Sequence, residues 1–274
     1  MAKPDSAGIG SPDLWRTIDN LDEAHDYERA KLRMETGGNI QPAIQHMHKT
    51  ADRRLIQLLL ARFLLLNFFI REARSAPGGF QEKEHRRLWV LLQVQPQIFR
   101  MHFDVDIFTD LAQLLHHTSI RDLKDRVVEQ YMEVLPVLSK VRNPSTNREE
   151  MPPLYLVVDE AQLTTSLRQG EFMSNNLNAS QSMLREIWLS YTGVLEYYQM
   201  RLVLSGTGID LTAMQDELAT QALKSERYDL KFDIGAFEDS HSQTAYIKRY
   251  IPGHWTEPCW RDFLIRAWGW LQGR

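Results

Sequence analysis

The stretch Leu154-Tyr-Leu-Val-Val-Asp-Glu-Ala-Gln162 decides the fold class that the sequence predicts. Five apolar residues are followed directly by two carboxylates. A short apolar run without polar alternation is typical of a strand in a parallel sheet whose two faces are both covered. We therefore expect a strand over residues 154–159 that is buried on both faces and ends at the acidic pair.

A second stretch of this kind is Met200-Arg-Leu-Val-Leu-Ser-Gly-Thr-Gly208. It predicts another buried strand, which runs into a turn whose glycines permit close approach of the backbone. A helix is expected between the two strands, from about Ser182 to Tyr198, and Tyr228 to Phe232 is a candidate third strand. Strands that alternate with helices favour an α/β fold with a mostly parallel sheet flanked by helices, followed by a helical C-terminal part.

The longest apolar run, Leu55 to Ile70, predicts a helix buried inside the protein. A membrane span needs about 20 apolar residues. This run is shorter and is interrupted by Gln57, Arg62 and Asn67. We therefore expect a buried helix over residues 51–73, ended by the Pro-Gly-Gly sequence that follows it.

The other segments carry simpler signals. Residues 88–95 are short, mostly apolar and bounded by Pro96, so they predict a further parallel strand. Residues 25–50 are polar, and we expect loop with some helix there; 143–153 is a charged loop that contains proline. Apolar residues at helical spacing predict helices within 14–21, 104–140, 246–250 and 260–271. The expected organisation is a polar N-terminal segment over 1–50, an α/β core over 51–235 and the start of a helical region over 236–274.

Composition excludes several classes of function. A net charge of −4 gives no electrostatic footprint for nucleic acid or for an anionic membrane. The single cysteine, Cys259, rules out a disulfide within the chain and favours a reducing compartment. Residues 1–10 lack the apolar core of a signal peptide. We expect an intracellular protein, in the cytoplasm or nucleus, with a protein partner whose identity the sequence leaves open, as it does the oligomeric state.

Asp159 and Glu160 are the first candidates for chemistry. Carboxylates at the carboxyl end of a parallel strand face the crevice where α/β sheets bind ligands. Adjacent strand residues point to opposite sides, which suits Asp159 for Mg²⁺, held through water, and Glu160 for the attacking water. This is the arrangement of a Walker B element in nucleotide hydrolases. The alternative is a pair that merely ends a strand and caps the next segment.

Ser205 and Thr207 are the second candidates. Nucleotide hydrolases with a strand beside the Walker B strand place a polar residue there, called sensor 1, which senses the γ-phosphate. The alternative is an ordinary strand-to-loop turn of small residues. Arg185 and Arg266 could contact a phosphate as cofactor-binding residues, as could Arg274, but each is more often a solvated helix charge or an ion-pair partner.

The 274 residues contain no Gly-x-x-x-x-Gly-Lys-Ser/Thr loop. In P-loop enzymes the backbone N–H groups and the lysine of that loop hold the β- and γ-phosphates. Without them the two carboxylates repel a triphosphate unless Mg²⁺ lies between. We therefore expect this chain to bind neither ATP nor Mg²⁺ as resident cofactors.

Two other constellations carry weaker signals. Asp229-Leu-Lys231 matches half of a metal-dependent nuclease site, for which Asp210 or Asp216 could be the distal acid; an alternating edge strand is the stronger interpretation. The paired histidines lack the spacing of a zinc site with other ligands; these are His46, His48, His116 and His117.

Several segments together resemble the P-loop NTPase module of fungal Crinkler-like proteins, a STAND/AAA-related group. The segments occur in the family's order and span nearly the whole chain; they are Gly8–Trp15, Ala61–Leu66, Arg86–Pro96, Leu154–Gln162, Ser205–Gly208, Asp233–Phe237, Tyr246–Pro252 and Arg266–Arg274. The resemblance implies a P-loop sheet, with Mg²⁺ and ATP as the ancestral cofactors. It assigns Asp159 to Mg²⁺, Glu160 to the attacking water, and Ser205 and Thr207 to the sensor.

In that family a Walker A segment comes just before the part that Gly8 begins, and the module continues beyond the part that Arg274 ends. The resemblance therefore implies a chain that is clipped at both ends. It also implies that the 202–205 strand lacks its Walker A neighbour, so that one side of this strand is unpaired or pairs directly with the strand beyond it. We expect the remnant of an NTPase module without independent ATP hydrolysis. The alternatives are a non-enzymatic protein-interaction module and, less favoured, a metal-dependent nuclease.

Overall fold

The computed structural model divides the chain into two compact units, Met1–Thr220 and Gln221–Arg274. Its described residues are mostly helical, with one parallel sheet of two strands, so the fold is α/β with large helical parts. The residues that the structure describes are 13–18, 21, 41–80, 82–94, 96, 107–137, 141–142, 149–150, 154–158, 161, 164, 172–173, 180–195, 200–205, 239–250 and 258–271.

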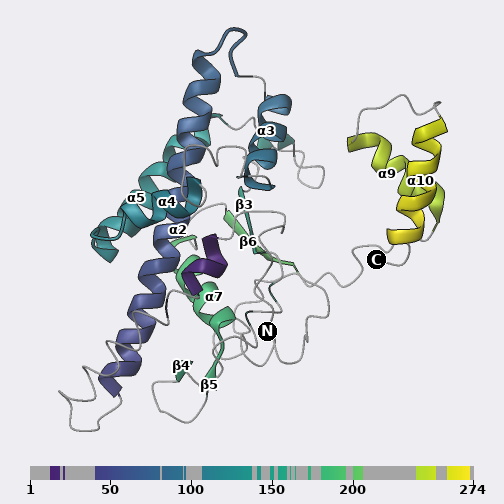
Figure 1. Ribbon diagram of the computed structural model, residues 1–274. Helices are drawn as coiled ribbons and strands as arrows, with labels where there is room; N and C mark the ends of the chain where they lie inside the picture. Colours follow the sequence, from purple (N-terminus) through teal and green to yellow (C-terminus); the bar gives the residue numbers. More distant parts are fainter. Residues whose placement is uncertain are drawn as a thin grey trace. The chain divides into compact units, whose positions relative to one another are not determined.

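Helix α2, Gln41–Ser75, is the centre of the first unit (Figure 1). Every residue from Leu55 to Ala61 is buried, so this part of the helix is covered on all its faces, as the apolar run predicted. The helix begins earlier than expected and runs through residue 50. It ends where predicted, because Gly78 and Gly79 follow with φ of 96° and 67°, in the left-handed region that favours glycine.

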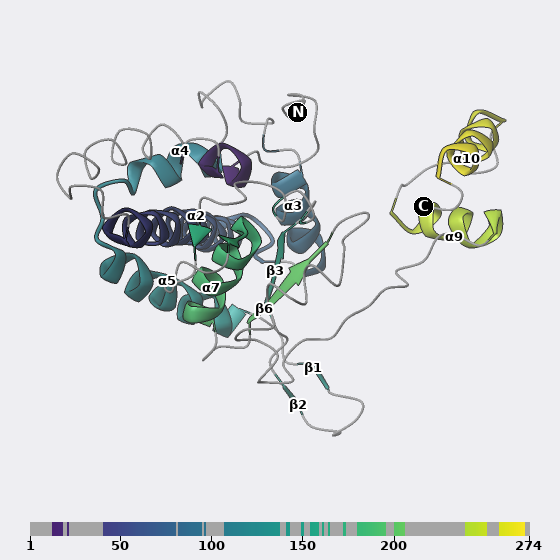
Figure 2. The same ribbon diagram turned by 90° about the horizontal axis from the view of Figure 1, so that it is seen from below.

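The helices with the most extensive packing against α2 are α4, Ile107–Leu114, α5, Ile120–Val134, and α7, Met183–Leu195 (Figure 2). Their positions confirm the helical spacing in 104–140 and the helix predicted between the two strands. A 3₁₀ turn, Leu135–Val137, continues α5. The residues that α5 buries recur at three- and four-residue spacing, as expected for one face of a helix; they are Leu123, Val127, Tyr131 and Val134.

The strand predicted over residues 88–95 is wrong, because this segment belongs to helix α3, Glu82–Val94. The charged and polar residues that precede the apolar run are good helix formers, so the helix starts before the run does. Trp89 packs its ring against Phe69 of α2 at 5.6 Å and against Phe108 of α4 at 6.2 Å. Three other apolar side chains of the run are largely exposed; they are Leu88, Val90 and Leu91. A short apolar run cannot by itself distinguish a strand from a helix.

A buried ion pair, the Asp13–Arg62 clasp, joins the helical residues 13–18 to α2. Arg62 Nη2 donates to Asp13 Oδ2 at 2.6 Å, and Asp13 is 2% exposed. The same guanidinium donates to Gln93 Oε1 of α3 at 3.2 Å and lies 4.7 Å from the ring centroid of Phe108 on α4. Burial, with a further contribution from Asp13, raises the pKa of Tyr191 on α7. The Arg62 guanidinium therefore contacts residues 13–18, α3 and α4 from its position on α2.

Polar side chains of α2 also bind the end of α4. Arg53 donates to the carbonyl oxygens of His116 and Thr118, the latter at 2.9 Å. Gln57, which is buried, donates through Nε2 to the carbonyl oxygen of Leu115 at 2.9 Å. Helix ends leave carbonyl groups without partners inside the helix. Arg53 and Gln57 of α2 therefore donate hydrogen bonds to backbone carbonyl groups just after the end of α4.

Two neighbouring parallel strands form the sheet. Strand β3, Leu154–Val158, pairs in register with β6, Met200–Leu204, so that Val158 lies opposite Leu204. Both strands and their parallel direction are as predicted. Two antiparallel pairs are very short: β1, Val141–Arg142, with β2, Glu149–Glu150, and β4, Phe172–Met173, with β5, Ser180–Gln181. Strand β2 lies within the segment that was expected to be loop throughout.

The expectation that β3 is buried on both faces is wrong. Tyr155 is 60% and Val157 57% exposed, whereas Val158 is 4% exposed. On β6 the partners of the two exposed residues, Arg201 and Val203, are exposed as well. Side chains of a strand alternate between its faces, so one face of the pair is covered and the other is open. We call the open face, made of Tyr155, Val157, Arg201 and Val203, the sheet face.

The second unit contains the two helices predicted near the C-terminus, α9, Ser240–Tyr250, and α10, Pro258–Leu271. Asp239 caps α9: its carboxylate accepts from the backbone N–H and the hydroxyl of Ser242, and these bonds lower the pKa of the Asp239 carboxyl. The buried Gln243 donates to the carbonyl oxygen of Ala267, which ties α9 to α10. No helix in the described ranges has the length and apolar character needed to cross a lipid bilayer.

Candidate functional site

The carboxyl ends of β3 and β6 are joined by backbone hydrogen bonds. The N–H of Ser205 donates to the carbonyl oxygen of Val158 at 2.9 Å, and the N–H of Ala161 donates to the carbonyl oxygen of Ser205 at 2.8 Å. Thr164 donates through its hydroxyl to the carbonyl oxygen of Ala161 at 2.6 Å. Ala161 and Thr164 are buried. We call these four residues the strand edge; ligands of α/β proteins bind at such edges.

The structure describes only some of the predicted site residues. Ser205 is at the strand edge and half-buried, directly after β6, as the sensor interpretation requires. Asp159 and Glu160 join Val158 to Ala161 in the sequence and lie outside the described residues, as does Thr207. The backbone groups that flank the acidic pair are thus both bonded to the same residue, Ser205.

The arginines that were considered for phosphate binding have other surroundings. Arg185, on α7, donates to Gln181 Oε1 at 2.6 Å and lies 3.6 Å from Glu186 Oε1, so its described contacts are with neighbours in its own chain segment. Arg266 is exposed on α10, in the second unit. Arg274 lies outside the described residues.

The weaker constellations are described only in part. The four residues considered for a nuclease, Asp210, Asp216, Asp229 and Lys231, all lie outside the described residues. No group of three or more His, Cys, Asp or Glu side chains able to hold a metal ion occurs within the part of the chain that the structure describes.

The paired histidines have structural environments of different kinds. The rings of His116 and His117 meet edge to face at 4.9 Å between centroids. The positive charge of Arg54, followed by burial and the charges of His117 and Arg53, holds the pKa of His116 below its ordinary value. His48 instead lies with its Nδ1 2.9 Å from a carboxylate oxygen of Glu186 on α7. The sequence did not predict this contact, because the spacing of residues within one helix does not show which residues of another helix lie beside it.

The fold and the strand edge define a class: a mostly helical α/β chain whose two parallel strands are bonded to each other at their carboxyl ends. No protein-family model matches the chain, and neither a curated protein nor a solved structure shows significant similarity to it.

Proposed function

We propose that the strand edge is the Walker B and sensor half of a P-loop NTPase-type site, of the kind that the resemblance to Crinkler-like modules implies. One observation carries the proposal. Ser205 bonds through its N–H to Val158 and through its carbonyl oxygen to Ala161, the two residues between which the sequence places Asp159 and Glu160. A sensor hydroxyl and a carboxylate pair that belong to one site need neighbouring backbone positions of this kind.

The roles follow from the chemistry of each group. Asp159 would hold Mg²⁺ through water, Glu160 would orient the attacking water, and Ser205 and Thr207 would sense the γ-phosphate. The sequence supplies no Gly-x-x-x-x-Gly-Lys-Ser/Thr loop to hold the phosphates. The function that this half-site supports best is therefore that of an NTPase remnant, which neither binds nor hydrolyses ATP as the 274 residues alone.

Titration calorimetry tests this proposal. The 274-residue chain should give no Mg-ATP binding at micromolar concentration. Fusing a Walker A strand, loop and helix in front of Met1 should create such binding, because the missing phosphate ligands are then supplied. In the fused chain Asp159→Asn should weaken binding, and Glu160→Gln should lower hydrolysis about 100-fold through loss of the general base.

Asp125→Asn is the matched control, since it removes one carboxylate from the exposed surface of α5, and it should leave binding and hydrolysis in the fused chain unchanged. Micromolar binding of Mg-ATP by the unfused chain would contradict the proposal. Binding by the fused chain that is indifferent to Asp159→Asn would also contradict it.

The open sheet face favours a second candidate function, a non-enzymatic protein-interaction module. Parallel strands are almost always covered on both faces, usually by helices. Here Tyr155 and Val157 are more than half exposed beside Arg201. An amphipathic helix of a partner, with an acidic residue opposite Arg201, would cover the apolar side chains and pair the charge.

A displayed library of amphipathic helical peptides tests this second function. Peptides selected on the wild-type chain should lose binding to Val157→Lys, because the new ammonium group lies in the centre of the sheet face, and should keep binding to Met132→Lys, which alters an exposed apolar residue on α5. Selected peptides that bind Val157→Lys as well as they bind wild type would exclude the sheet face as their site.

A further inference from the structure

A histidine–carboxylate contact between α2 and α7 plays no part in the proposed half-site. His48 Nδ1 of α2 lies 2.9 Å from Glu186 Oε2 of α7. The side chain of Glu186 is 5% exposed and that of His48 is 23% exposed. The ring of His48 also packs on Phe172 of β4, with 5.5 Å between ring centroids. A carboxylate buried to this extent needs a hydrogen-bond donor and gains from a positive charge.

Arg185, the nearest other cation on α7, does not replace His48 as this donor. Its Nη1 lies 3.6 Å from Glu186 Oε1, which is too long for a hydrogen bond, and donates instead to Gln181 Oε1 at 2.6 Å. Oε1 of Glu186 accepts no hydrogen bond from any described residue. Among the described residues, the imidazole of His48 is therefore the side chain placed to donate a hydrogen bond to this carboxylate.

Other charged side chains lie near this contact on the described elements. On α2 they are Lys49 and Asp52, and Asp52 is paired with Lys124 of α5 at 2.8 Å. On α7 the neighbour is Arg185, and the β4 residues are uncharged. Imidazole is the side chain that changes its charge between about pH 5 and pH 8. Among the described side chains of this contact, His48 is therefore the one whose charge can change in that range.

We propose that His48 and Glu186 form a proton-operated latch that controls how firmly α7 is held on α2. With His48 protonated, an imidazolium faces the buried carboxylate, and the ion pair holds α7. As pH rises through the titration of His48, the imidazole becomes neutral, the hydrogen bond loses its charge assistance and α7 opens more often. The latch is thus closed at mildly acidic pH and loosened above neutrality. It is independent of the proposed nucleotide half-site.

Hydrogen exchange of the full chain, measured by mass spectrometry at about pH 5.5 and about pH 8, tests the latch. Dividing the protection of α7 peptides by that of α5 peptides removes the intrinsic effect of pH on exchange. This ratio should fall about tenfold from the lower to the higher pH, as expected for loss of a charge-assisted bond. An unchanged ratio in the wild-type chain, which needs no variant, overturns the proposal.

Two substitutions locate the effect. His48→Gln keeps a hydrogen-bond donor but does not titrate in this range. At both pH values the ratio should therefore equal the low ratio that the wild-type chain shows at about pH 8. His46→Gln, on the same helix two positions away, is the matched control and should keep the tenfold change. A pH dependence that survives His48→Gln, or that His46→Gln abolishes, assigns the effect to another group and overturns the latch.

Discussion

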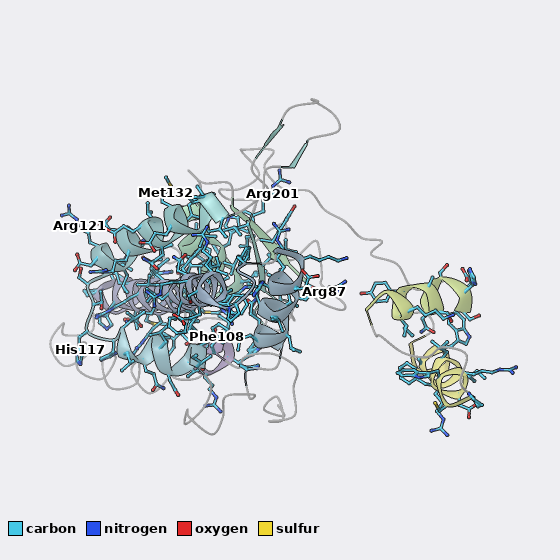
Figure 3. All side chains as sticks on the ribbon, turned by 90° about the horizontal axis from the view of Figure 1, so that it is seen from above. Arg87, Phe108, His117, Arg121, Met132 and Arg201 are labelled. Atoms are coloured by element: carbon cyan, nitrogen blue, oxygen red, sulfur yellow. The ribbon has the colours of Figure 1, made fainter. Side chains whose placement is uncertain are left out.

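Arg62→Ala should lower the free energy of unfolding by about 3–5 kcal/mol, because it leaves the buried carboxylate of Asp13 without its charged partner. The substitution also removes the hydrogen bond to Gln93 and the contact of the guanidinium with the Phe108 ring. Phe108 lies among the packed side chains of the helices (Figure 3). Urea denaturation followed by circular dichroism at the helical band measures the change.

Arg121→Ala is the control, since the side chain of Arg121 is 90% exposed on α5 and points away from the helices (Figure 3). It should change the free energy of unfolding by less than about 0.5 kcal/mol. The double variant Arg62→Ala, Asp13→Ala should be less destabilised than the sum of the single changes, because it removes both charges of the pair. Equal effects of Arg62→Ala and Arg121→Ala would show that the clasp does not stabilise the fold.

The second large effect is expected at the end of β3. Val158→Lys should cost about 3 kcal/mol or more, because the side chain is 4% exposed and the ammonium group would lose its contact with water there. The same urea denaturation measures it. A variant that fails to fold at all, seen as loss of the helical signal, would equally show that position 158 does not tolerate a charge.

Val157→Lys is the matched control, one residue away and with the same change of side chain. Val157 is 57% exposed, so this variant should lie within about 0.5 kcal/mol of wild type. The pair of variants distinguishes the open face seen in the structure from the doubly covered strand that the apolar run predicted. A large and similar loss in both variants would mean that the sheet face is covered.

Local signals in the sequence were sufficient for much of the fold. The runs of β3 and β6 were long enough for one strand each, and the segment between them has the spacing of α7. The apolar residues of α2 were correctly assigned to a buried helix. Segment 88–95 was not, because its apolar run fits a strand as well as a helix, and only the packing of Trp89 on Phe69 and Phe108 shows which face is used.

The candidate site was predictable to the extent that it depends on chain order. Two parallel strands that end in polar residues must bring those ends to one edge, and Ser205 is there. The resemblance to an NTPase module assigns roles to Asp159, Glu160 and Thr207, which the described residues do not include. The sequence made Arg185 a candidate phosphate ligand, but its hydrogen bond to Gln181 depends on the geometry of the turn before α7.

The sequence by itself determined the parallel strand pair, the central apolar helix and the acidic pair that follows β3, since each is encoded by neighbouring residues. The tertiary structure alone decided which face of β3 is open, and which distant charges meet. Asp13 and Arg62 are 49 positions apart, and His48 and Glu186 lie on helices that are still further apart in the sequence. The physical reason is that burial and charge pairing depend on which parts of the chain pack against a residue. The residues next to it in the sequence do not specify those parts.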